Sequence, residues 1–269
     1  MTWNLIEALT GYVTGDEWNS NGHKVGQVVT VKTHYPHREG NAEVVTKLKP
    51  GSDGQIPRAI VLLRNPQNAL PSYLNFLYEV ENELEGHSQR APMEEWLTWR
   101  DHEFDAEIKQ WKDHAEYWLD RYSPESRLVL SFEGLTDDIG GPRFAQELAR
   151  FLDVSVGVPV IYQDSVQCVW ETVIKYRGEA PLSSVEESQE LRGSNPQIGS
   201  NGPNLSDSDP SKPQSRRKGN AHYPYTLAQL DRVIDVLELL RKKYGDRQLT
   251  DILDSYIRTI NGVKESIKK

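Results

Sequence analysis

Three short apolar runs along the chain end in polar or charged residues. The runs are residues 28–31, 59–63 and 128–131, followed by Lys32-Thr33-His34, Arg64-Asn65-Pro66 and Phe132-Glu133. They are rich in Val, Ile and Leu and do not alternate with polar residues, which is typical of strands buried on both faces of a parallel sheet. Because ligands of such sheets bind outside the carboxyl ends of the strands, we expect Lys32, His34 and Arg64 to converge there. Two cations beside an imidazole suit an anionic substrate that undergoes group transfer.

Apolar periodicity and turn residues predict helices between and after these strands. We expect helices at about 2–10, 68–85, 93–121, 142–153, 164–176, 226–244 and 247–266, strands at about 28–33, 58–63 and 127–132, and loops at 11–27 and 36–57. The alternation of strands and helices predicts an α/β fold, in one domain over residues 1–269. Residues 193–215, dominated by Asn, Ser, Asp, Pro and Gly, are predicted to be a flexible loop within it.

Composition and charge narrow the class of protein. The chain has 269 residues, is 37% hydrophobic and carries a net charge of −9, which predicts a globular domain without a broad nucleic-acid-binding surface. Cys168 is the only cysteine, so an internal disulfide and a multi-cysteine metal site are excluded. No apolar run approaches the length of a membrane span, and the first fifteen residues lack a secretory core.

The second apolar run is followed by a candidate phosphate site. Asn68 is a plausible N-cap, which would place Pro71 at the third helical position and Ser72 in the first turn. Exposed N–H groups and the helix dipole favour an anion there, so Arg64 and Ser72 are predicted to hold one phosphate from two sides. The alternative is a structural salt bridge at Arg64 and a simple helix cap at Ser72.

These residues resemble the motifs of one enzyme family. Lys32-Thr33-His34-Tyr35-Pro36 is similar to the Lys-Thr-His-x-Pro element of sulfotransferases that use 3′-phosphoadenosine 5′-phosphosulfate (PAPS). The other similar segments are Arg64-Asn65-Pro66 with Ser72 and Tyr73 (the 3′-phosphate segment), Phe132-Glu133-Gly134-Leu135 (Tyr-Glu-Asp-Leu, with Phe for Tyr) and Arg217-Lys218-Gly219 (Arg-Lys-Gly). Order and spacing agree over about residues 2–225. Residues 5–11 and 14–16 further resemble the branch that includes the WSC-domain sulfotransferases.

The first motif of that family is where the chain departs from it. Sulfotransferases begin with a strand and a phosphate-binding loop, Pro-Lys/Arg-Ser-Gly-Thr-Thr-Trp, and here residues 1–6 match only the end of that loop. The resemblance implies a P-loop-like three-layer fold, a central parallel sheet flanked by helices, with the first strand and phosphate loop largely missing. We expect a misassigned or truncated start. By resemblance, Thr2 would still contact the 5′-phosphate and Trp3 would stack on adenine.

The resemblance implies transfer of a sulfonate group from PAPS to an acceptor hydroxyl or amine. His34 would be the general base, because the pKa of imidazole is close to neutral, and Lys32 would stabilise charge on the transferring group. The other expected nucleotide-binding residues are Arg64, Ser72, Phe132, Arg217, Lys218 and Gly219. This chemistry needs no metal, and the pair His34 and His37 lacks a third ligand at typical spacing.

Several other polar residues are interpreted as structural. His114 falls in the region that borders the acceptor pocket in the resembling family, but a helix-surface position is the simpler interpretation. The residues Glu79, Glu81, Glu83 and Glu85 are interpreted as a solvated helix surface. The tryptophans Trp96, Trp99, Trp111 and Trp118 are expected to pack in the core rather than to bind a cofactor.

Two alternatives to an active sulfotransferase stay open. One is a non-catalytic remnant that binds a nucleotide, and the other is a P-loop kinase, although no Gly-x-x-x-x-Gly-Lys-Ser/Thr occurs. The expected acceptor is a small molecule or a glycan. The chain as written suggests the cytoplasm, whereas an upstream anchor would place it in the Golgi.

Overall fold

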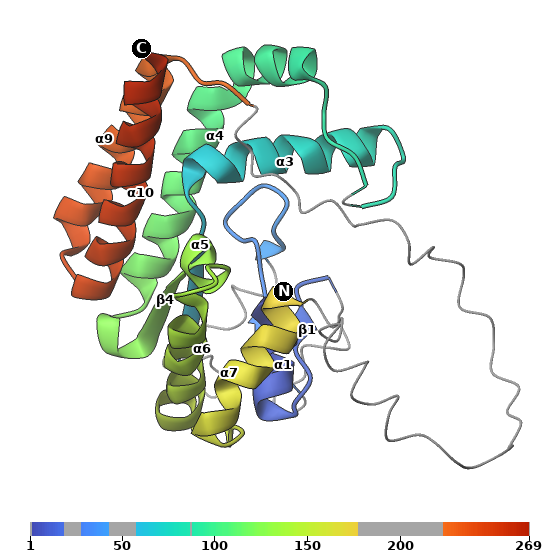
Figure 1. Ribbon diagram of the computed structural model, residues 1–269, viewed down its shortest axis with the longest axis vertical. Coiled ribbons are helices and arrows are strands. Elements are labelled where there is room, and N and C mark those ends of the chain that lie inside the picture. Colours follow the sequence, from blue (N-terminus) through green and yellow to red (C-terminus); the bar gives the residue numbers. More distant parts are fainter. Residues whose placement is uncertain (1, 19–27, 43–57, 87, 177–222, 269) are drawn as a thin grey trace, which may run out of the picture.

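The computed structural model describes residues 2–18, 28–42, 58–86, 88–176 and 223–268. The expected loop at 193–215 and the expected binding residues Arg217, Lys218 and Gly219 lie outside these ranges. The described part is a mixed α/β structure in which helices predominate (Figure 1).

Helices occupy most positions where periodicity predicts them. The helices are α1 (Thr2–Thr10), α3 (Pro66–Glu81), α4 (Met93–Arg121), α5 (Phe132–Leu135), α6 (Gly141–Arg150), α7 (Val166–Trp170), α9 (Leu227–Tyr244) and α10 (Arg247–Ile267). Short 3-10 turns, η1 (Pro124–Ser126) and η3 (Gln163–Ser165), and π turns, η2 (Phe151–Val156) and η4 (Glu171–Lys175), connect or extend them. The helices expected at 2–10, 93–121, 226–244 and 247–266 are confirmed to within about a residue.

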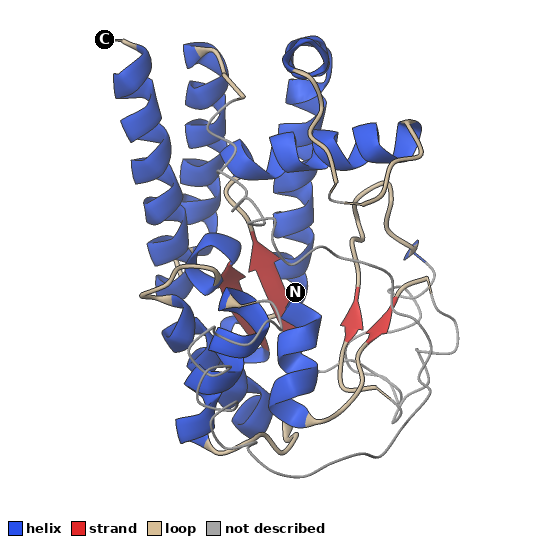
Figure 2. Ribbon diagram, turned by 45° about the vertical axis from the view of Figure 1, so that its right-hand side comes forward, coloured by secondary structure: helices blue, strands red, loops and turns tan. Residues whose placement is uncertain are grey.

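The strands form two separate parallel pairs (Figure 2). Strand β3 (Ala59–Leu63) pairs with β4 (Arg127–Ser131), from Ala59 opposite Arg127 to Leu63 opposite Ser131. Strand β2 (Val31–Lys32) pairs instead with β1 (Gly15–Asp16). The expectations that 28–33 is a strand of one central sheet with 58–63 and 127–132, and that 11–27 is only loop, are therefore wrong for the described residues. An apolar run predicts an extended segment, but its partner is decided by backbone hydrogen bonds between distant parts of the chain.

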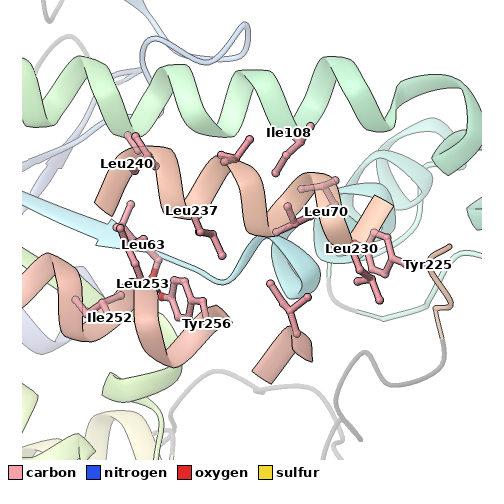
Figure 3. Packing of buried hydrophobic residues seen from close by; sticks show 14 of the residues in the cluster. Leu63, Leu70, Ile108, Tyr225, Leu230, Leu237, Leu240, Ile252, Leu253 and Tyr256 are labelled. Atoms are coloured by element: carbon pink, nitrogen blue, oxygen red, sulfur yellow. Dashed lines mark hydrogen bonds between the residues drawn. The ribbon is translucent and has the colours of Figure 1, made fainter. Parts of the chain in front are cut away.

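Helices cover both faces of the β3–β4 pair. Val61, Leu63 and Val129 belong to a core formed with α3, α4, α9 and α10, and Figure 3 shows side chains of α9 and α10 around Leu63. Leu128 and Leu130 point into a second core formed with α1, α5, α6 and α7. This alternation follows from the strand geometry, in which successive side chains point to opposite faces. All five residues of β4 are buried, as the run of apolar residues predicts.

Capping residues define the antiparallel pair of C-terminal helices (Figure 1). Thr226 and Gln229 form a reciprocal capping box at the start of α9, which satisfies two N–H groups of its first turn. Gly245 ends α9 in the left-handed conformation, at φ 64°, where a side chain would be strained. Asp246 then caps α10 through a hydrogen bond from the Leu249 N–H group at 2.8 Å.

Helix α3 begins earlier than expected. Its N-cap is Asn65, whose Oδ1 accepts a hydrogen bond from the Gln67 N–H group at 3.0 Å, and Pro66 occupies the first position. Pro suits that position because its φ is already helical and an N–H group there would have no partner. The assignment of Asn68 as the cap is therefore wrong. Ser72 lies in the second turn rather than the first, and Pro71 lies inside the helix.

The acidic residues near the end of α3 do not form one solvated surface. Glu79 is buried, and its Oε1 accepts a hydrogen bond from the Gln89 N–H group at 3.1 Å. The helix ends at Glu81, and Glu83 has a φ of 52° in the turn beyond it. The interpretation of the four Glu residues as one helical face is therefore wrong, because the helix ends before all four can share it.

Candidate functional site

One face of α4 forms hydrogen bonds with the segments that follow two strands, β3 and β2. The indole N–H group of Trp111 donates to the Arg64 carbonyl at 3.1 Å, just beyond β3. Two turns later, the indole N–H group of Trp118 donates to the Tyr35 carbonyl at 2.8 Å, beyond β2. Residues spaced in this way share one helix face, so α4 holds both polar segments beside it. The tryptophans pack as expected, and two of them also fix candidate site loops.

His34 lies just beyond β2 with its imidazole between a buried carboxylate and solvent. Its Nδ1 is 2.8 Å from Oε1 of Glu17, and half of the side chain is exposed. The following Tyr35–Pro36 peptide is cis. A hydrogen bond from Nδ1–H to the carboxylate leaves the lone pair of Nε2 available as a base.

Glu17 is the residue that organises this corner, and the sequence interpretation missed it. Its Oε1 also accepts the His34 N–H group at 2.8 Å, and its Oε2 accepts the Thr33 hydroxyl at 2.7 Å and the Asn41 N–H group at 2.8 Å. Burial alone would raise the pKa of Glu17, but these hydrogen bonds outweigh it and hold the pKa below its ordinary value. The carboxylate is therefore ionised at neutral pH.

Lys32 and Trp3 come together from β2 and α1. The Nζ of Lys32 lies 4.8 Å from the centre of the Trp3 ring, a cation–π contact. Thr2 precedes Trp3 in the first turn of α1, and its buried Oγ1 has no hydrogen-bond partner among the residues that the structure describes. An unsatisfied buried hydroxyl at a helix N-terminus fits a ligand with anionic oxygen atoms. Three of the expected site residues thus occupy neighbouring elements.

Arg64 and Phe132 come together from the ends of β3 and β4. The guanidinium carbon of Arg64 lies 4.5 Å from the centre of the Phe132 ring. The next residue, Glu133, joins the same two corners by accepting the Asn65 N–H group at 3.1 Å and the Asn68 side-chain amide at 3.2 Å. The parallel register of β3 and β4 aligns these two corners at one end of the pair.

Ser72 has a different setting from the one expected. In the second turn of α3, its N–H group belongs to the helical hydrogen-bond ladder, so only its hydroxyl is available to an anion. The neighbouring Tyr73 donates its hydroxyl proton to Glu39 at 2.7 Å, and burial followed by that contact raises the pKa of Tyr73 to about 12. The expected placement of Ser72 in the first turn, where N–H groups are open to an anion, is therefore wrong.

His114 belongs to the site rather than to the open surface of α4. It lies on the same helix face as Trp111 and Trp118, and it is half-buried. Burial, followed by the nearby charges of His37 and His34, lowers the pKa of His114 to about 4. The interpretation of His114 as an open surface residue is therefore wrong, because a single histidine in a helical sequence does not reveal which distant residues come near it.

A second acidic residue of α4 holds the loop beyond His34. Glu107 is buried and pairs with Arg38 at 2.8 Å and with Nε2 of His37 at 3.8 Å. His37 and His34 therefore have different carboxylate partners. In the part of the chain that the structure describes, no group of three His, Cys, Asp or Glu side chains is arranged to hold a metal ion.

The lengths of the helices and the comparisons with known proteins bear on the class of protein. None of the described helices combines the length and apolar character needed to cross a membrane. No family model, curated protein or solved structure matches the chain. What the protein does must therefore follow from its own residues.

Proposed function

We propose that the protein is a sulfotransferase that moves a sulfonate group from PAPS to a hydroxyl or amine acceptor. The fold proposed with it is P-loop-like and three-layered, and the helices on both faces of the β3–β4 pair support it. The order of four motif-like segments along the chain, at 32–36, 64–73, 132–135 and 217–219, is the sequence support.

The arrangement at the end of β2 carries the proposal. His34 has its Nδ1 bound to Glu17 and half of its side chain open to solvent, and Lys32 lies two residues before it against Trp3. A base beside a cation suits the transfer of an anionic group, and an aromatic ring beside them suits the stacking of a nucleotide base. The Thr2 hydroxyl, which has no hydrogen-bond partner within the described part of the chain, supports a phosphate oxygen in the same place.

In this proposal His34 accepts the acceptor's proton at Nε2 as the acceptor oxygen forms its bond to sulfur. The bond from sulfur to the bridging oxygen breaks, and its electron pair stays on the 5′-phosphate of 3′,5′-ADP. Lys32 stabilises the negative charge that develops on that oxygen. Trp3 supplies a flat surface for adenine, and the Thr2 hydroxyl donates to the 5′-phosphate.

Arg64 is proposed to hold the 3′-phosphate, together with the Ser72 hydroxyl and with Arg217, Lys218 and Gly219. The Phe132 ring supports this role, because its contact with the guanidinium fixes the plane of the donor fork. Arg suits a phosphate, since two parallel N–H groups can bind two of its oxygens.

Nucleotide discrimination tests the proposal. Addition of 3′,5′-ADP should raise the unfolding temperature well above the rise that 5′-AMP produces, because only the former carries a 3′-phosphate. At a ligand concentration of a hundred times Kd the stabilisation should be about 2.7 kcal/mol. Equal shifts with both nucleotides would reject a 3′-phosphate site, and a larger shift with ATP would favour the kinase alternative.

Two substitutions separate binding from chemistry. His34→Ala should lower transfer from labelled PAPS by about 10²–10⁴-fold and leave 3′,5′-ADP binding nearly unchanged, because His34 handles only the acceptor proton. The matched control is His102→Ala, at an exposed position of α4. Binding without any transfer in the unaltered protein would favour the non-catalytic alternative.

Arg64→Ala should instead weaken 3′,5′-ADP binding by about 1.5–3 kcal/mol, the cost of a lost charged hydrogen bond. Arg143→Ala, a change at an exposed arginine of α6, is the control for the change in net charge. If His34→Ala and Arg64→Ala weakened nucleotide binding equally, the proposed division of roles would be wrong. Transfer assays with a panel of small hydroxylated molecules and glycans would identify the acceptor.

A further inference from the structure

Glu17 lies where a short parallel pairing brings two distant segments into register. Strand β1 pairs with β2 so that Asp16 is opposite Lys32, and the Glu17 N–H group donates to the Lys32 carbonyl at 3.0 Å. This pairing places Glu17 beside the residues that follow β2, among them His34. Only 1% of the Glu17 side chain is exposed, so this carboxylate is oriented by protein rather than by water.

The carboxylate is fully satisfied by its neighbours. Four hydrogen bonds reach its two oxygens, and all four partners lie in the segment that carries His34 or in the turn after it. Two of the four come from His34 itself, one from its backbone N–H group and one from Nδ1. An ionised carboxylate held in this way can fix both the position and the orientation of the imidazole.

We propose that Glu17 is a positioning residue that holds His34 as the Nδ1–H tautomer, with Nε2 directed to the acceptor. This inference rests on the proposed function. As the acceptor proton passes to Nε2, the imidazole becomes positively charged, and the Glu17 carboxylate at 2.8 Å stabilises that charge. No proton needs to reach Glu17. Glu17 is thus a carboxylate that supports a histidine base, and the pairing of β1 with β2 places it beside His34.

The other charged groups near His34 do not take this role. His114 faces it from α4 and is neutral at physiological pH. His37 lies on the same loop and is 3.8 Å from Glu107, the carboxylate that also binds Arg38. Among the described residues, Glu17 supplies the carboxylate within hydrogen-bond distance of the His34 ring.

The tautomer of His34 can be measured without any turnover. Correlation of ring hydrogens with ring nitrogens by ¹⁵N NMR distinguishes a protonated from an unprotonated nitrogen, and His34→Gln identifies the His34 signals. We expect a protonated Nδ1 and an unprotonated Nε2 in the neutral ring. The opposite tautomer in the unaltered protein would overturn the inference.

Kinetics then test the contribution of the charge. Glu17→Gln keeps the size of the side chain and removes its charge, so the transfer rate should fall by about 10–10³-fold while the Kd for 3′,5′-ADP changes less than about threefold. Glu17→Asp keeps the charge and should recover part of the rate. Equal rates for Glu17→Gln and the unaltered protein would overturn the inference.

The matched control uses a second carboxylate that anchors the same strand. Glu7 of α1 accepts the Thr14 N–H group and the Thr14 hydroxyl, both at 2.8 Å, and makes no contact with His34. Glu7→Gln should therefore leave the transfer rate within about threefold. Equal losses in Glu7→Gln and Glu17→Gln would assign Glu17 a purely structural role.

The two proposals fail in different ways. If the protein transfers no sulfonate from PAPS while His34 is in the Nδ1–H form, the proposed function is overturned. The role of Glu17 in that reaction is overturned with it. Transfer with His34 in the other tautomer would overturn the inference about Glu17 alone. If Glu17→Gln does not fold, the tautomer in the unaltered protein still decides the question.

Discussion

The buried charged side chains of Arg127 and Glu17 lie where several donors or acceptors meet. Arg127, at the start of β4, donates to the Leu119 carbonyl at 2.7 Å and to Asp246 at 2.7 Å, so it joins β4 to the end of α4 and the cap of α10. Glu17 follows the same rule with four donors. Burial of a charge is tolerated only when its hydrogen-bonding capacity is filled, and each of these residues therefore marks a junction between elements.

His114 should make the folded protein sensitive to acid. The folded-state pKa is about 4 and the ordinary value is 6.5, so between these pH values only the unfolded chain binds the proton. The free energy of unfolding should fall as the pH drops below about 6.5. His114→Gln removes this titration. Between pH 7 and pH 5 the free energy of unfolding should therefore fall by about 1–2 kcal/mol less in His114→Gln than in the unaltered protein, after allowance for partial exposure.

Urea unfolding at a series of pH values measures this difference. His102→Gln serves as the control, because His102 lies at an exposed position of the same helix. Parallel pH profiles for the unaltered protein and for His114→Gln would show that burial does not keep His114 neutral.

At the scale of elements, Tyr256 joins the ends of β3 and β4 to α10. Its hydroxyl donates to the Leu63 carbonyl at 3.0 Å and accepts from the Ser131 hydroxyl at 2.9 Å, which in turn accepts the Gly134 N–H group at 3.1 Å. Burial, followed by the charge of Glu133, raises the pKa of Tyr256, so the hydroxyl keeps its proton. This chain of hydrogen bonds fixes the corners that carry Arg64 and Phe132.

Tyr256→Phe should lower the free energy of unfolding by about 1–3 kcal/mol, because the Leu63 carbonyl and the Ser131 hydroxyl each lose a buried partner. Equilibrium urea unfolding measures the change. Tyr162→Phe, at a residue that is 89% exposed, should alter stability by less than about 0.5 kcal/mol. Similar values for the two variants would mean that the Tyr256 hydroxyl contributes nothing.

The loop that carries His34 depends on a close backbone approach at Gly40. A Cβ at Gly40 would overlap the backbone nitrogen of Tyr35, the residue next to His34. Gly40→Ala should therefore displace this loop and lower both the transfer rate and the free energy of unfolding, the latter by about 1–3 kcal/mol. It should leave nucleotide binding at Arg64 nearly intact.

The comparison for Gly40 is Gly262→Ala in α10, where an added Cβ meets nothing within 4 Å. That change should be neutral or stabilise the protein by up to about 1 kcal/mol, because Ala favours helix over Gly. An equally harmless Gly40→Ala would show that the turn after His34 adjusts freely.

At the scale of the whole molecule, the β3–β4 pair belongs to both apolar cores. Val129 packs in the core of α3, α4, α9 and α10, whereas its neighbours Leu128 and Leu130 pack in the core of α1, α5, α6 and α7. Neither core can lose its packing without exposing one face of the same two strands. We therefore expect the described elements to unfold together.

Leu237→Ala in the first core and Leu148→Ala in the second should each lower the stability of a single transition, by about 2–5 kcal/mol. Far-UV circular dichroism and tryptophan fluorescence should give coincident urea curves for both variants. A second transition in either variant would show that the two cores are independent units.

Local patterns predicted a large part of this structure. The helices at 2–10, 93–121, 226–244 and 247–266 and the strands at 58–63 and 127–132 follow from periodicity and capping residues, which act between near neighbours in the chain. The start of α3 was misplaced because two Asn residues, Asn65 and Asn68, can each serve as an N-cap. The choice between them depends on Pro66 and on the contact of Asn68 with Glu133.

The sequence by itself determined most of the helices, the strands at 58–63 and 127–132 and the polar residues that follow these strands, since these properties depend on residues close together along the chain. Only the tertiary structure decided the strand partners and the surroundings of each site residue. It paired β2 with β1, placed Glu17 behind His34, brought His114 close enough to His34 and His37 for their charges to lower its pKa, and joined Tyr256 to both strand ends. Each of these contacts joins segments that are distant in the chain, and such contacts depend on packing and on filling buried hydrogen-bond groups, which no local pattern specifies.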